Sequence, residues 1–179
     1  MSININHETE TITATSGTVT IAGTLAGSLP ASSYDYVKAY LTSNFVPTTD
    51  TTSKVPFDQT TINYNSYFDT VTNHRYTPLI AGYYRILFNC VFNTNNVTNA
   101  TYTAYIYKKT SPVAAAYWEA PQTAGLGGGL ETSMCCETLE YMNGIDDYIE
   151  CWVTPTGYGP YPPTVYSSVY NSSVIINKV

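Results

Sequence analysis

The sequence of 179 residues predicts an all-β protein, an antiparallel jelly-roll sandwich preceded by an extended N-terminal arm. Short segments in which apolar and polar residues alternate recur along the chain, as in half-buried strands. No segment shows the 3.6-residue period of a long helix. Tyrosine is unusually abundant, with 18 copies, and favours strands. Eight or more short strands are typical of a sandwich or jelly roll.

The strand pattern begins at residue 36 and continues to the end of the sequence. The clearest strand is expected over 82–92, where Tyr84, Ile86, Phe88, Cys90 and Phe92 fall on one face. We expect the remaining strands over 36–41, 54–57, 101–108, 130–142, 147–153 and 165–176. Loops are expected over 42–54, 93–99, 125–129 and 154–164, and a loop or edge over 63–68.

Residues 1–33 form a separate region, predicted to be an attachment arm, and residues 34–179 form the jelly-roll domain. The arm is rich in Thr and Gly and has the alternation of one or two short strands, but too few apolar residues to form a core. Such a strand satisfies its backbone groups by pairing with the sheet edge of another subunit. The apolar contacts of the arm are expected from Ile12, Val19, Ile21 and Leu25.

Charge and hydropathy exclude several classes of function. Thirteen acidic and seven basic residues give a net charge of −6, and the basic residues are scattered, so we expect no nucleic-acid partner. No apolar run reaches the roughly 18 residues of a membrane helix, so no membrane partner is expected. The first ten residues lack the basic and apolar parts of a secretory signal. We therefore expect synthesis in a cytoplasm and either use there or release without a cleaved signal.

No residues form a pattern typical of catalysis or metal binding. The two histidines, His7 and His74, give no support for a Ser/His/Asp triad, and without a C-x-x-C spacing a zinc site is not expected. Asp146 and Asp147 could form a carboxylate pair or bind calcium, although a solvated turn is the preferred interpretation. A glycan-cleaving enzyme needs paired carboxylates in a cleft. The sequence therefore predicts neither an enzyme nor a cofactor.

The four cysteines are predicted to be buried, reduced, structural thiols. Cys90 and Cys151 lie in apolar, strand-like segments, where free cysteines are commonly buried. Cys135 and Cys136 are adjacent and are interpreted as structural and not redox-active.

A set of spaced, mostly aromatic residues extends from residue 57 to residue 88: Phe57, Asn63, Phe68, Tyr76, Gly82, Tyr84, Ile86 and Phe88. This set resembles the signature of the globular head of complement component 1q, which shares its jelly roll with tumour necrosis factor. Tyr76 replaces a Phe and stands one residue late, and Ile86 replaces another Phe. The last strand lacks the family's Phe-x-Gly. The resemblance covers about residues 34–179.

This resemblance implies a homotrimer with aromatic and aliphatic strands at the subunit contacts, and a role in binding or assembly. The Thr-, Asn- and Tyr-rich composition looks like that of a bacteriophage virion protein. Within that class we expect a capsid decoration or cement protein, joined to other virion proteins by the arm. The alternative is a tail-fibre tip or receptor-binding head that recognises a host surface glycan or protein. The expected location is the virion, after synthesis in the host cytoplasm.

Overall fold

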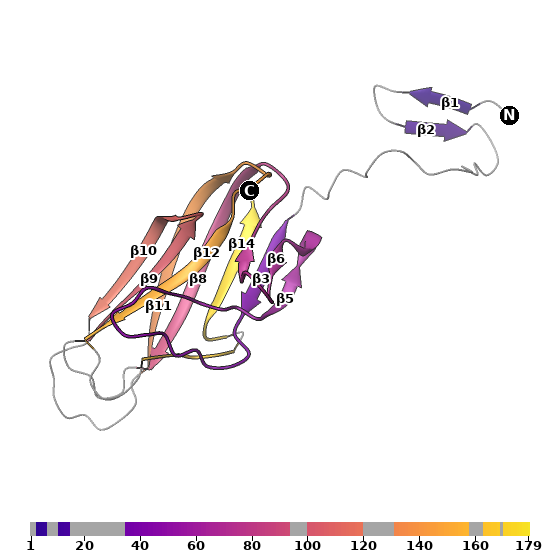
Figure 1. Ribbon diagram of the computed structural model, residues 1–179. Helices are drawn as coiled ribbons and strands as arrows, with labels where there is room; N and C mark the ends of the chain where they lie inside the picture. The colour runs from indigo at the N-terminus through magenta and orange to yellow at the C-terminus, as the bar shows by residue number, and fades with distance from the viewer. Residues whose placement is uncertain are drawn as a thin grey trace. The chain divides into compact units, whose positions relative to one another are not determined.

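The structure, a computed structural model, describes residues 3–6, 11–14, 35–93, 100–119, 131–157, 163–168 and 170–179. The chain divides into two compact units, Met1–Pro30 and Ala31–Val179. The second unit is an all-β sandwich of two antiparallel sheets, so the predicted fold class is confirmed (Figure 1). Its described helical content is one 3₁₀ turn, η1 (Tyr64–Ser66).

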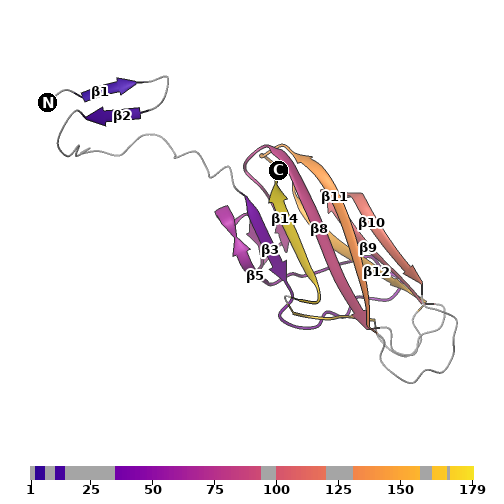
Figure 2. The same ribbon diagram turned by 180° about the vertical axis from the view of Figure 1, so that it is seen from behind.

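Two sheets form the layers of the sandwich, and each is named here after one of its strands. The β9 sheet has the order β10 (Ser111–Glu119), β9 (Thr101–Lys108), β12 (Ile149–Thr156), β7 (Arg75–Tyr76), β6 (Phe68–Asp69), with β4 (Ser53–Lys54) paired to β12. The β8 sheet has the order β11 (Glu131–Met142), β8 (Gly82–Asn93), β14 (Ser173–Lys178), β3 (Tyr36–Tyr40), β5 (Gln59–Asn63), with β13 (Thr164–Val165) paired to β8. Figure 2 shows β14 lying between β3 and β8.

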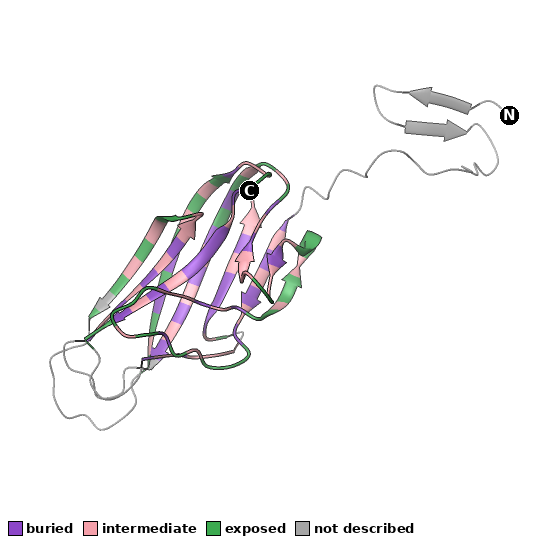
Figure 3. Cartoon of the chain, viewed as in Figure 1, coloured by how far each residue is buried: buried purple, intermediate pink, exposed green. Residues whose placement is uncertain are grey.

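The core lies between the two sheets and follows from strand alternation. On β8, the side chains of Tyr84, Ile86, Phe88, Cys90 and Phe92 are completely buried, which confirms the face predicted from the sequence. The same alternation buries Tyr102, Ala104 and Ile106 of β9 and every second residue of β12 from Ile149 to Pro155, where Glu150 is buried as well (Figure 3). Because successive side chains of a strand point to opposite faces, one row of each strand enters the core and the other faces outward.

Several predicted boundaries were wrong. Residues 111–119 were not predicted as a strand, yet they form β10, whose Ala and Pro content is unusual for a strand. Edge pairing with β9 supplies its backbone partners, and the register shifts beside Pro112, as expected of a bulge at an edge. The predicted strand over 165–176 is two strands, β13 and β14. The predicted strand over 54–57 is confined to β4, and β12 extends through Pro155 into the predicted 154–164 loop.

In the N-terminal unit, β1 (Ile3–Asn6) and β2 (Thr11–Ala14) form an antiparallel pair in which Ile5 lies opposite Ile12. The alternation over residues 9–15 predicts the second of these strands, whereas the first was not predicted. The other predicted strand of the arm, within residues 16–23, lies outside the described residues. Val19, Ile21 and Leu25 lie outside the described residues. Pairing of the arm with another subunit stays a prediction.

Candidate functional site

Six of the eight positions of the aromatic signature are buried in the core between the sheets. Phe57 is 1% exposed, and its ring contacts that of Phe88 edge to face, with centroids 6.0 Å apart. Such edge-to-face pairs add stability beyond the area that they bury. The buried members are Phe57, Phe68, Tyr76, Tyr84, Ile86 and Phe88.

Asn63 and Gly82 shape the chain beside this core. The Asn63 amide donates to the carbonyl of Phe68 at 3.1 Å, and its side-chain oxygen accepts from the Phe68 N–H at 3.1 Å. These two bonds bridge the turn between β5 and β6. Gly82 begins β8 at φ +156°, and a Cβ there would lie 2.6 Å from Cε of Lys178. The asparagine therefore fixes a turn, and the glycine allows Lys178 to lie against the backbone.

The tyrosine that replaces phenylalanine in the signature has its own polar partner. The Tyr76 hydroxyl donates to Oδ2 of Asp35 at 2.6 Å, and Asp35 is 1% exposed. Oδ1 of Asp35 has no hydrogen-bond partner among the described residues. Burial raises the pKa of Asp35, against the opposing effects of Tyr76, Tyr84 and Lys178. Burial and the charge of Asp35 raise the pKa of Tyr84 to about 12. This cluster connects the start of β3 to β7 and β8, and its role is structural.

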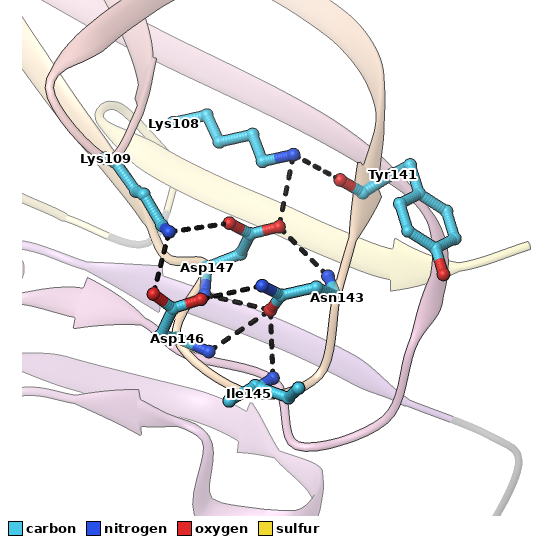
Figure 4. Close-up of polar contacts among 7 residues, drawn as sticks. All are labelled: Lys108, Lys109, Tyr141, Asn143, Ile145, Asp146 and Asp147. Atoms are coloured by element: carbon cyan, nitrogen blue, oxygen red, sulfur yellow. Dashed lines mark hydrogen bonds and ion pairs between the residues drawn. The ribbon is translucent and has the colours of Figure 1, made fainter.

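Asp146 and Asp147 lie in a turn between β11 and β12, as predicted, but only Asp146 is solvated. Asp147 is 7% exposed. Lys109 Nζ contacts Asp146 Oδ2 at 2.9 Å and Asp147 Oδ1 at 3.3 Å, and Lys108 Nζ contacts Asp147 Oδ2 at 3.2 Å (Figure 4). The Asn143 side-chain oxygen accepts from three backbone N–H groups of the turn. Both carboxylates are therefore bound to lysines.

The expectation that all cysteines are buried was wrong for one of the four. Cys90, Cys136 and Cys151 are buried, whereas Cys135 is exposed. Burial raises the pKa of Cys90 and Cys151 well above the usual range, and that of Cys136 to about 11. Adjacent residues of β11 point to opposite faces, so Cys136 enters the core and Cys135 faces outward. All four are free thiols.

The outward face of the β8 sheet carries exposed apolar and aromatic side chains on neighbouring strands, and we call it the assembly surface. Tyr83 and Leu139 are 55% and 57% exposed. Tyr83 packs against Tyr141 of the next strand, with ring centroids 5.4 Å apart. An ion pair between Arg85 and Glu137 lies among them. The other apolar or aromatic members are Tyr36, Tyr40, Ile62, Leu87, Val91 and Ile175.

Within the described residues, no group of three or more His, Cys, Asp or Glu side chains is placed to hold a metal ion. The part of the chain that the structure describes has no helix long and apolar enough to cross a membrane.

Comparisons with known proteins show the fold alone. No protein-family model and no curated protein matches the sequence. Among solved structures, murine APRIL at pH 5.0 is similar with a TM-score of 0.57 at 10% identity, over 82% of this chain and 99% of that one. Eiger TNF from S. frugiperda is similar with a TM-score of 0.52 at 6% identity, over 82% of this chain and 91% of that one. The sandwich is therefore a jelly roll of the tumour necrosis factor and complement 1q type.

Proposed function

We propose that this protein is a non-enzymatic binding and structural module that forms a homotrimer through the assembly surface. The observation that carries the proposal is the outward face of the β8 sheet, where exposed Tyr83, Leu139 and Tyr141 lie together. Contiguous exposed apolar patches are rare on soluble monomers and mark interaction sites. Tyrosine suits such a contact because it combines a large ring area, few rotatable bonds and a polar tip. A second copy of the chain is the partner that the resemblance to complement 1q heads implies.

The biological setting that we propose is a bacteriophage virion, with the protein as a capsid decoration or cement protein. The Thr-, Asn- and Tyr-rich composition and the separate N-terminal unit support this proposal. Three arms on one trimer would bind a capsid with avidity, so that weak single contacts suffice. The alternative, a tail-fibre tip or receptor-binding head, requires a ligand site on the jelly roll. Deletion of residues 1–33 tests the arm as the attachment device, because it should abolish incorporation into the particle while leaving a folded trimer.

Light scattering on matched variants tests the trimer. The native protein should have three times the chain mass of 19.7 kDa at micromolar concentration. Leu139→Lys places a charge on the assembly surface and should give monomers, because an unpaired charge is costly to bury. Tyr117→Lys is the control, since Tyr117 is 64% exposed on β10 in the other sheet. A monomeric native protein, or equal effects of the two variants, would refute the proposal.

A further inference from the structure

A pocket with polar and apolar lining lies at the β6–β7 end of the β9 sheet, and none of its lining residues belongs to the assembly surface. Its volume is about 420 Å³, within the range of small-molecule sites. It is formed by the chain between β5 and β8, and its lining combines amides, hydroxyls, apolar groups, the guanidinium of Arg75 and the carboxylate of Asp69. The other lining residues are Asn65, Ser66, Tyr67, Asn73, Thr77 and Leu79.

The pocket walls are held in place by local bonds. Asp69 accepts hydrogen bonds from the N–H groups of three residues of the following turn and from the Asn73 amide, at 2.8–3.0 Å. These donors hold the pKa of Asp69 well below its usual range. Asn65 and Ser66, which also line the pocket, have φ of +59° and +56°, a backbone conformation that is costly for non-glycine residues and concentrates at functional sites.

Arg75 is the pocket's available positive charge. Its guanidinium lies 4.3 Å from the ring centroid of Tyr148, and no carboxylate of the described residues forms an ion pair with it. Stacking covers one face of the guanidinium and leaves its in-plane N–H groups available for a bidentate contact with a carboxylate. Asp69 lies opposite Arg75, lines the same pocket and stays ionised, but its oxygens already accept hydrogen bonds from the turn. The guanidinium of Arg75 is therefore the charged group of the pocket that is still available to a ligand, and its geometry suits a carboxylate.

A row of aromatic side chains continues from the pocket along the β9 sheet, and we call it the aromatic row: Tyr105, Tyr107 and Trp152. The ring centroids of Tyr105 and Tyr107 are 5.9 Å apart, and those of Tyr107 and Trp152 are 5.6 Å apart. Lys54 connects the row to the pocket, because its Nζ lies 5.7 Å from the Trp152 ring and donates to the Asn73 carbonyl at 2.9 Å. Its other contact, Glu150 at 3.0 Å, neutralises its charge.

We propose that the pocket binds an acidic sugar residue of a polysaccharide, with its carboxylate on Arg75 and the adjoining sugars on the aromatic row. Amides and hydroxyls in the pocket suit the hydroxyl groups of a sugar. Aromatic rings suit the apolar faces of the following sugars. The proposal goes beyond the trimer, since none of these residues belongs to the assembly surface. It supplies the ligand site that the receptor-binding alternative requires.

Calorimetric titration of the full-length protein tests this site. The probes are the methyl glycosides of glucuronic, galacturonic and sialic acid, with methyl glucoside and inorganic phosphate as comparisons. At least one acidic glycoside should bind about tenfold or more tightly than methyl glucoside, because the charged hydrogen bonds are lost with the neutral sugar. Phosphate should not compete at equal concentration. Binding of none of the acidic glycosides, equal binding of the glucoside, or full competition by phosphate would overturn the proposal.

Matched variants assign the contact to individual residues. Arg75→Gln should weaken binding about tenfold or more, whereas Arg85→Gln, which removes the chain's other arginine from the assembly surface, should leave it unchanged. Asn65→Gly keeps the left-handed backbone and removes the amide, so it should weaken binding without loss of fold. Trp152→Leu should remove the gain in affinity of a trisaccharide over its terminal sugar. Unchanged affinity in Arg75→Gln overturns the site, and an unchanged trisaccharide gain overturns the role of the aromatic row.

The mass of each variant is measured in the same samples by light scattering. Absence of sugar binding by a trimeric native protein would refute this site alone. Sugar binding by a monomer would refute the trimer alone.

Discussion

Removal of the Tyr76 hydroxyl by Tyr76→Phe should destabilise the protein by about 1.5–3 kcal/mol at neutral pH, the usual range for a hydrogen bond to a charged group. The contact is short, with 2.6 Å between the hydroxyl oxygen and Asp35 Oδ2, as expected for a bond to a carboxylate. Asp35 is 1% exposed, so water has little access to replace the lost donor. Oδ1 of Asp35 already has no hydrogen-bond partner among the described residues, and the variant also removes the hydroxyl that donates to Oδ2.

The pH dependence of this loss has a definite sign. The folded-state pKa of Asp35 is raised by burial, so the folded state holds this proton more tightly than the unfolded state. Ionisation of Asp35 therefore lowers the free energy of unfolding progressively as the pH rises above the pKa that Asp35 has in the unfolded state. Removing the hydroxyl raises the folded pKa further, so the difference between the variant and the native protein should grow toward neutral pH. Below the unfolded pKa it should shrink to about 0.5–1.5 kcal/mol, the range for a neutral hydrogen bond.

Urea unfolding followed by circular dichroism at one fixed protein concentration measures these differences, since assembly makes stability depend on concentration. Tyr117→Phe is the control, because Tyr117 is 64% exposed, and it should change the free energy of unfolding by less than about 0.5 kcal/mol. In a double-mutant cycle, Asp35→Ala combined with Tyr76→Phe should cost less than the sum of the single variants. An additive cycle, or a Tyr76→Phe loss that increases toward acid pH, would refute the reasoning.

Two further predictions concern the thiols and the turn between β11 and β12. Titration with a chromogenic disulfide should find one reactive thiol in the native protein and four after unfolding. The folded Cys135→Ser variant should have no reactive thiol. A second fast-reacting thiol in the native protein would contradict the burial of Cys90, Cys136 and Cys151. Gly144→Ala should destabilise the protein by about 2 kcal/mol or more, since Gly144 has φ +69° and a Cβ would lie 2.5 Å from the backbone nitrogen of Ala81. A thermal midpoint equal to that of the native protein would contradict this expectation.

The sequence could predict those elements whose alternation is strong. The inward row of β8 and the buried Ile149, Cys151 and Val153 of β12 follow from a period of two, which is a local property. Strand β10 could not be predicted in this way, because its place depends on pairing with β9 and not on its own Ala-rich composition. Local patterns therefore predict strands best where one face of the strand is completely buried.

The candidate sites depend still more on contacts between distant parts of the chain. Asp147 becomes buried because lysines at the end of β9 reach the turn before β12. Arg75 meets Tyr148 only after β7 and β12 have paired. No spacing in the sequence brings these residues together. The assembly surface could have been predicted from the same alternation as the core. Tyr83, Leu87 and Val91 stand at outward positions of β8, where polar residues are expected.

The central place of β14 has a consequence for how the protein is made. Strand β3 leaves the ribosome early, but one of its two neighbours, Ser173–Lys178, follows more than a hundred residues later. At ordinary translation speeds this is a delay on the order of ten seconds. During that time β3 and β8 present unpaired edges, which are sites of aggregation for nascent chains. Folding of the β8 sheet must therefore be completed after translation of residues 173–178, and chaperone binding to the waiting strands would raise the yield of soluble protein.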